Sequence, residues 1–159
     1  SQSLHIPVHA SREEKYSELT PQLIALFNGE SNLNANAANF AALVSTTFGF
    51  HWVGFYWVID ADLVLGPFQG PIACTRIAKG KGVCGTAWLK NETIVVPDVE
   101  AFPGHIACDS ASASELVVPV LRDGAVIAVI DLDSPTPARF TEADAEGVTA
   151  LAALLSDRV

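Results

Sequence analysis

The spacing of apolar residues changes twice along this chain, and that change constrains its fold more than any other feature. Residues 11–28 and 32–48 carry apolar side chains at mixed spacings of three and four, which predicts two helices, the first bent or restarted at Pro21. From His51 onward, short runs of aromatic and β-branched residues broken by turn residues predict strands. The helical spacing returns after residues 140–144, which have the pattern of a capped helix start.

The predicted strands number six, and together they indicate one largely antiparallel sheet. The N-terminal helices and the C-terminal helix would cover one face of this sheet, and loops would cover the other, which is an α+β arrangement. We expect a single domain over residues 1–159. The strand-like runs are residues 51–60, 63–68, 72–78, 93–98, 115–121 and 125–133.

Charge and composition argue against several classes of partner. Eighteen acidic residues against nine basic ones give a formal net charge of -9, which repels nucleic acid backbones. No stretch approaches the roughly 20 apolar residues of a membrane-spanning helix. We therefore expect neither nucleic acid nor a membrane as a partner. The three cysteines cannot all pair within one chain, which favours a cytoplasmic setting with free thiols.

Two segments without strand periodicity are candidates for functional loops. Residues 80–85 satisfy the GxGxxG pattern of a phosphate-binding loop, but too few residues follow for the crossover helix of a dinucleotide-binding fold. We interpret them as a glycine-rich segment that presents Cys84 at a loop tip or at the start of a short helix, where a thiolate is favoured. Residues 98–114 contain Cys108, and a connection of that length is typical of a lid or binding loop.

The spacing of the cysteines leaves several roles open. Cys74, Cys84 and Cys108 contain no CxxC pair, so a zinc site formed by all three with His105 is disfavoured and we expect no metal. Cys74 lies in an apolar run, where a small buried hydrophobe and a reactive thiol are equally acceptable interpretations. Burial is harder to arrange for Cys84 and Cys108, which lie in glycine-rich or polar segments. A Cys-His acyl-transfer pair with His105 has little support.

The alternation of side chains along two predicted strands places further candidate residues. Trp52 and Tyr56 share one face of their strand, and this face either lines an apolar pocket or belongs to a core. Asp131 and Asp133 also share one face, at the end of a strongly apolar strand. Two such carboxylates are unexpected there unless they are solvated or bind a cation, and a solvated strand end is the simpler interpretation.

Taken together, these segments resemble the free methionine-R-sulfoxide reductases, which are enzymes made of a single GAF domain. The similarity covers nearly the whole chain from the first helix, and the set of motifs in this order is highly specific. The motifs are WVGFYW, LGPFQGPIACTRI, GKGVCGTAW, VPDV, residues 102–109, SELVVPV and VIDLDS.

The resemblance implies a GAF-like fold and a thiol-dependent reduction of free methionine-R-sulfoxide. In that family pattern Cys108 attacks the substrate sulfur, and an upstream cysteine resolves the sulfenic acid that forms. Thioredoxin then restores the two thiols, so no cofactor is implied. Between Cys74 and Cys84 the sequence leaves the resolving cysteine open, with a slight preference for Cys74 and with Cys84 as a second thiol on the pocket side.

The resemblance also implies roles for five pocket residues. Glu115 and Asp131 match the family carboxylates, either of which could supply a proton, and Asp133 would join them around the substrate ammonium. Trp52 and Tyr56 match the aromatic residues that hold the thioether. The family suggests a homodimer. The alternative function is a non-catalytic GAF module that senses a small molecule or redox state, although such sensors generally report to an attached output domain.

Overall fold

The computed structural model describes residues 10–108 and 111–158, which form four α-helices, six strands and one short 3-10 helix. The predicted order of helices, strands and closing helix is confirmed. The elements are α1 (Arg12–Phe27), α2 (Leu33–Phe48), β1 (Trp52–Ile59), β2 (Asp62–Gln69), β3 (Arg76–Ala78), α3 (Gly82–Lys90), β4 (Ile94–Val96), the 3-10 helix (Val99–Ala101), β5 (Ser114–Arg122), β6 (Ala125–Ser134) and α4 (Glu142–Ser156).

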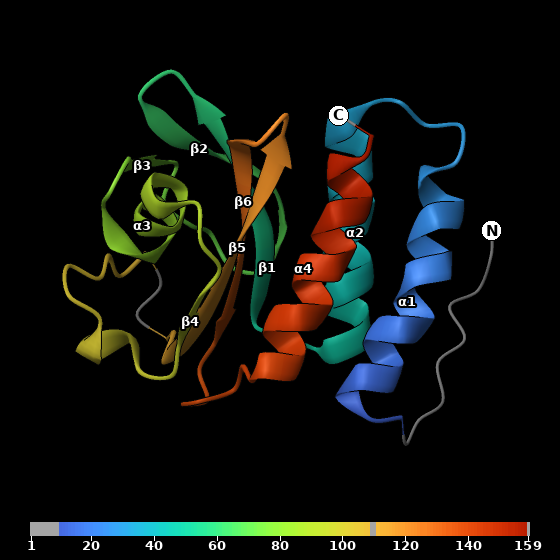
Figure 1. Ribbon diagram of the computed structural model, residues 1–159. Coiled ribbons are helices and arrows are strands. Elements are labelled where there is room, and N and C mark those ends of the chain that lie inside the picture. The colour runs from blue at the N-terminus through green and yellow to red at the C-terminus, as the bar shows by residue number, and fades with distance from the viewer. Residues whose placement is uncertain (1–9, 109–110, 159) are drawn as a thin grey trace.

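The six strands form a single sheet in the order β3-β2-β1-β6-β5-β4, and every neighbouring pair is antiparallel. Helices α1, α2 and α4 lie on one side of this sheet, and α3 lies on the other with the long loops (Figure 1). The predicted α+β arrangement is therefore confirmed. In the described part of the chain no helix is both long and apolar enough to cross a membrane.

Two apolar clusters sit on the two faces of the sheet. Along β1, Val53 and Phe55 are buried in the cluster beneath α1, α2 and α4, whereas Trp52 and Tyr56 are buried in the cluster beneath α3. This split confirms the predicted alternation of the strand, because successive side chains point to opposite faces. The face that carries Trp52 and Tyr56 also bears the candidate active site.

Helix ends follow the signals in the sequence. The side chain of Asn32 caps α2 by accepting a hydrogen bond from the Ala35 N–H at 2.9 Å, and Gly49 ends that helix with a left-handed φ of 66°. Of the two expectations at Pro21, the restart is wrong, because α1 runs through this residue without a break, and the bend stays a prediction. Proline removes one backbone donor, but the buried side chains of Leu19, Leu23 and Phe27 hold the helix against the core.

The predicted strand over residues 72–78 is largely wrong, since β3 begins only at Arg76. Residues 72–74 are not part of the sheet. The Cys74 carbonyl accepts a hydrogen bond from the Tyr56 hydroxyl at 2.9 Å, and Ile72 is 90% exposed. Cys74 therefore lies in a loop and not in an apolar strand.

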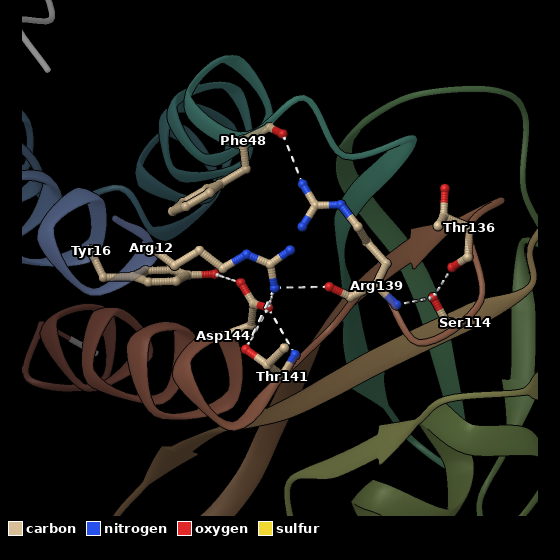
Figure 2. Close-up of polar contacts among 8 residues, drawn as sticks. All are labelled: Arg12, Tyr16, Phe48, Ser114, Thr136, Arg139, Thr141 and Asp144. Carbon is tan, nitrogen blue, oxygen red and sulfur yellow. Dashed lines mark hydrogen bonds and ion pairs between the residues drawn. The ribbon is translucent and has the colours of Figure 1, made fainter. Parts of the chain in front are cut away.

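A buried polar network joins the two ends of the fold (Figure 2). Asp144 of α4 is fully buried and accepts hydrogen bonds from Tyr16 and Arg12 of α1. It also accepts from the backbone N–H of Thr141, which closes the predicted capping box of α4. Burial and the neighbouring Asp144 charge raise the pKa of Tyr16 well above its usual range.

The same network reaches the start of β5. Arg139 lies over the Phe50 ring and donates from its backbone N–H to the Ser114 hydroxyl, which in turn donates to the Thr136 carbonyl at 2.7 Å. Ser114 is fully buried and immediately precedes Glu115. The network therefore fixes the strand position from which one candidate site residue projects.

Candidate active site

A pocket opens on the α3 side of the sheet. Its walls come from β1, β5 and β6, from the start of α3 and from the two loops that contain Cys74 and Cys108. All the predicted site residues line it except Cys74, which lies directly behind the lining residue Ala73. The lining residues are Trp52, Tyr56, Ile72, Ala73, Ile77, Lys81, Gly82, Val83, Cys84, His105, Ile106, Cys108, Ser112, Glu115, Asp131 and Asp133.

A disulfide joins Cys74 to the pocket-lining residue Cys108, with their Cα atoms 5.2 Å apart. The bond connects the loop before β3 to the loop that follows the 3-10 helix. It also means that these two cysteines cannot serve together in the zinc site considered from the sequence. A disulfide with one of its cysteines in the pocket wall is placed where thiol-disulfide exchange with a pocket ligand could take part in chemistry.

Cys84 differs from the other two cysteines because it is a free thiol and is only 3% exposed. It is the third residue of α3, and its Sγ lies 3.9 Å from Glu115 Oε2. The short-helix prediction is right, but the expectation that its segment would resist burial is wrong. Burial and the charges of Asp131 and Glu115 raise the pKa of the Cys84 thiol, so these effects override the helix N-terminus that would favour a thiolate.

The glycines of the GxGxxG pattern have a packing role here. Gly82 begins α3 with a φ of 61°. At Gly85 a Cβ atom would lie 2.5 Å from the Ala78 carbonyl oxygen, so only glycine lets α3 approach the end of β3 this closely. The pattern thus sets the depth of α3, and with it the position of Cys84.

Three carboxyl groups project into the pocket from adjacent strands. In the β5–β6 register Glu115 lies opposite Asp133, and Val117 lies opposite Asp131. Glu115 and Asp131 are 6% and 7% exposed, so the interpretation of Asp131 as part of a solvated strand end is wrong. Burial and the Asp133 charge raise the pKa of Glu115 to about 8, and burial and the Glu115 charge raise the pKa of Asp131 well above its usual range. Glu115 is therefore mainly protonated at neutral pH.

Trp52 and Tyr56 form the apolar side of the pocket. Their rings stack with centroids 6.0 Å apart, and both polar ends are bonded to the same loop. The Trp52 Nε1 donates to the Pro71 carbonyl at 3.0 Å, and the Tyr56 hydroxyl donates to the Cys74 carbonyl at 2.9 Å. The aromatic face thus serves as both core and pocket wall, and it anchors the loop that carries one half of the disulfide.

His105 also lines the pocket, and neither role considered for it from the sequence, zinc ligand or partner of a catalytic cysteine, was favoured. Its Nε2 lies 3.7 Å from Glu115 Oε1. Burial lowers the pKa of His105, and that of Glu115 is raised, so at neutral pH this contact joins an imidazole and a carboxylic acid and not two charges. Ile106 from the same loop lines the pocket as well. The sequence feature that could have identified His105 and Ile106 as pocket residues is their place in the aperiodic segment 98–114.

The chain is similar to proteins of known family over most of its length. The GAF domain family model matches residues 36–158. GAF domain-containing protein A of Dictyostelium discoideum is 53% identical over 148 residues, which is 92% of this chain and 94% of that protein. Free methionine-R-sulfoxide reductase of Escherichia coli (strain K12) is 45% identical over 146 residues, which is 91% of this chain and 88% of that protein.

A solved structure gives the same result. The X-ray structure of free methionine-R-sulfoxide reductase from Neisseria meningitidis, in complex with its substrate, has a TM-score of 0.95 to this chain at 48% identity. The match covers 98% of this chain and 94% of that one. With its fold, its pocket and these similarities taken together, the chain belongs to the GAF-domain family of free methionine-R-sulfoxide reductases.

Proposed function

We propose that this protein reduces free methionine-R-sulfoxide to methionine with its own thiols. The observation that carries the proposal is a pair of bonded cysteines, Cys74 and Cys108, at a pocket with an aromatic wall on one side and three carboxyl groups on the other. The relatives in Escherichia coli and Neisseria meningitidis are named free methionine-R-sulfoxide reductases, and such a combination of thiols and an amino acid site would suit that activity.

Substrate binding follows from the two sides of the pocket. The sulfoxide methyl and the methylene groups would pack on Trp52 and Tyr56, because thioether-like groups pack well against aromatic rings. The substrate ammonium would lie among Glu115, Asp131 and Asp133. Asp131 Oδ1 is buried and has no hydrogen-bond partner among the described residues, so a ligand that donates hydrogen bonds would satisfy it.

The chemical steps need one acid and two thiols. In the reduced enzyme the Cys108 sulfur attacks the sulfoxide sulfur while an acid protonates the sulfoxide oxygen. Burial raises the pKa of both candidate acids, that of Glu115 to about 8 and that of Asp131 well above its usual range, so either one would keep a proton available at neutral pH. Methionine leaves with two electrons from the enzyme, and the oxygen stays on Cys108 as a sulfenic acid.

The sulfenic acid then condenses with a second thiol, which releases the oxygen as water and forms a disulfide. We assign this resolving role to Cys74, because its sulfur can reach that of Cys108. Cys84 would remain a thiol of the pocket wall, consistent with its burial and raised pKa. A dithiol protein of the thioredoxin class would reduce the disulfide and complete the cycle.

Further parts of the proposal concern the protein as a whole. Residues 1–159 would act as one domain and associate as a homodimer in the cytoplasm. The odd number of cysteines supports a reducing compartment, where the Cys74–Cys108 bond is opened after each turnover.

The test uses single turnover of prereduced protein with free methionine-R-sulfoxide. Cys108→Ser should release no methionine, whereas Cys74→Ser should release about one methionine per protein, since only the later disulfide step is blocked. Methionine release by Cys108→Ser at the wild-type rate would contradict the assignment of the nucleophile. If the wild type binds the sulfoxide but yields no methionine, the protein is a sensor module and not a reductase.

A further inference from the structure

Three potential metal ligands meet in the pocket, apart from the redox disulfide. These are the Cys84 Sγ and one carboxyl oxygen each from Glu115 and Asp131, and the three atoms lie within 4.8 Å of one another. All three residues are buried. They come from three different elements, α3, β5 and β6, so the fold and not local sequence brings them together.

One of these groups, the Asp131 carboxyl, has an oxygen that lacks a hydrogen bond within the described part of the chain. Asp131 is 7% exposed, its Oδ1 has no hydrogen-bond partner among the described residues, and its side chain lines the pocket. A buried acceptor without a partner is costly, and burying several acidic groups together costs more unless a positive charge joins them. A divalent cation at this point would satisfy the orphaned oxygen and would favour the ionised form of the carboxyl groups around it.

The donor set indicates which cation would fit. One sulfur and two carboxyl oxygens suit a thiophilic divalent ion such as zinc, whose tetrahedral bonds of about 2.3 Å to sulfur and 2.0–2.2 Å to oxygen place such ligands roughly 3.5 Å apart. Cys84 Sγ and Glu115 Oε2 are 3.9 Å apart, so they need to approach by only a few tenths of an ångström. Calcium and magnesium prefer oxygen-only sites and would bind poorly.

A candidate fourth ligand lies beside Glu115, and its side chain would have to shift to join the three clustered atoms. His105 Nε2 lies 3.7 Å from Glu115 Oε1, and its side chain is 16% exposed at the pocket wall. An imidazole or a water molecule would complete a tetrahedral site. The site considered from the sequence used all three cysteines with His105, and the present set shares only His105 and Cys84 with it. It therefore does not need either cysteine of the disulfide.

We propose that the pocket binds a thiophilic divalent cation, Zn²⁺ or Cd²⁺, through Cys84, Glu115 and Asp131, with His105 or water as fourth ligand. Cys84 would bind as the thiolate and Glu115 and Asp131 as carboxylates, and the protons that these groups carry in the free pocket would be released to solvent. The site overlaps the position assigned to the substrate ammonium, so the cation excludes the substrate. This second part, reversible inhibition by the metal, rests on the proposed function.

Binding is tested on the oxidised protein, in which Cys74 and Cys108 are held in their disulfide and Cys84 is the one free cysteine. Cd²⁺ is the probe, because cadmium thiolate bonds have a charge-transfer absorption in the ultraviolet. Titration should give one Cd²⁺ per chain together with that absorption, and Zn²⁺ should displace it. Absence of a stoichiometric thiolate signal would overturn the proposal.

Variants separate this site from surface binding. Cys84→Ser should remove the absorption, and Asp131→Asn should weaken binding at least tenfold while the absorption persists at saturation. Glu92→Gln is the matched control, since Glu92 is exposed and lies outside the pocket, and its affinity should equal that of the wild type. Equal affinity of the wild type and Asp131→Asn would contradict the assigned ligand set.

Competition distinguishes the metal site from the proposed reaction. Free methionine-R-sulfoxide, added to the oxidised protein with Cd²⁺ bound, should lower the apparent affinity for the metal. If Cd²⁺ binds but the sulfoxide does not compete, the metal site stands and the substrate position is wrong. If the reduced enzyme turns over the sulfoxide but no Cd²⁺ binds to the oxidised form, the proposed function stands and the metal inference fails.

Discussion

At the scale of single residues, the pocket depends on carboxyl groups whose environment favours the protonated form. Glu115 is the clearest case, because it is buried opposite Asp133 in the sheet register and its pKa is raised to about 8. A protonated carboxyl can donate to a sulfoxide oxygen, which a solvated glutamate at neutral pH cannot do. The same residue therefore links the stability of the protein to its proposed chemistry.

The pKa of Glu115 predicts how stability changes with pH. The folded state keeps the proton up to about pH 8, whereas an unfolded chain loses it near the ordinary glutamate value of 4.5. The folded state thus binds more protons in this window, and its stability falls as pH rises. Glu115→Gln removes this term, so its free energy of unfolding relative to the wild type should increase by several kcal/mol between pH 5 and pH 8.

Urea unfolding of the disulfide-linked proteins, in buffers that contain a chelator, measures this difference. The comparison between variant and wild type cancels the contribution of titrating groups that do not interact with Glu115. A difference that stays constant from pH 5 to pH 8 would show that Glu115 is ionised in the folded state.

Asp133 provides a test of substrate recognition at the same scale. If the free ammonium lies among the carboxylates, Asp133→Asn should raise KM by roughly ten- to a hundredfold, the usual cost of one charge-assisted contact. N-acetylation of methionine-R-sulfoxide should lower kcat/KM by a similar factor. Because both changes remove the same contact, the variant should lose little more on the acetylated substrate. Full additivity of the two effects in steady-state kinetics would place the ammonium elsewhere.

At the scale of elements, α3 determines the depth of the pocket. Its N-terminal turn packs on the end of β3, where Gly85 leaves no space for a side chain beside the Ala78 carbonyl. Cys84 is the residue before Gly85, so a shift of this turn would also move Cys84. A change at Gly85 therefore tests whether the packing of α3 sets the geometry of the site.

Gly85→Ala should destabilise the protein by about 1–3 kcal/mol, as is typical of an overpacked position, and should also weaken catalysis. The matched control is Gly124→Ala, where no atom lies within 4 Å of the added methyl group but the φ of 80° is strained. That variant should lose stability without losing kcat/KM. Thermal unfolding and steady-state kinetics of both variants provide the measurement, and full activity of Gly85→Ala would refute the role of this packing.

The elements also show what the sequence could and could not predict. Short runs of aromatic and β-branched residues located β1, β5 and β6, because both faces of each strand meet an apolar cluster. The run 72–78 failed because the bonds that draw residues 71–74 away from the sheet come from Trp52 and Tyr56, which are distant in the chain. The burial of Cys84 could not be predicted for a similar reason, since it depends on how closely α3 approaches the sheet.

The candidate site also has some features that the sequence could predict and others that it could not. The residues of the pocket were predictable from the family resemblance, and the structure places Trp52, Tyr56, Glu115, Asp131 and Asp133 around one cavity. The sequence could not predict that His105 lies near Glu115, or that three potential ligands cluster at Cys84. These contacts join loops and strands with no common sequence period.

At the scale of the whole molecule, the disulfide connects two loops that are 34 residues apart in the chain. Closing a loop of this length in the unfolded chain should make the oxidised protein more stable than the reduced one by about 2–4 kcal/mol. Each turnover would then alternate between a more and a less stable form. Urea unfolding with and without dithiothreitol measures the difference, and Cys74→Ser, which cannot form the bond, should not respond to dithiothreitol.

The central claim is that Cys74 and Cys108 together supply the electrons for sulfoxide reduction, and one measurement tests it most directly. Reduced wild-type protein is mixed with limiting free methionine-R-sulfoxide, quenched with an alkylating agent under denaturing conditions, and mapped by peptide mass spectrometry. The account predicts one Cys74–Cys108 disulfide for each methionine formed, with Cys84 fully alkylated. A disulfide that contains Cys84, or methionine formed without any disulfide, would contradict it.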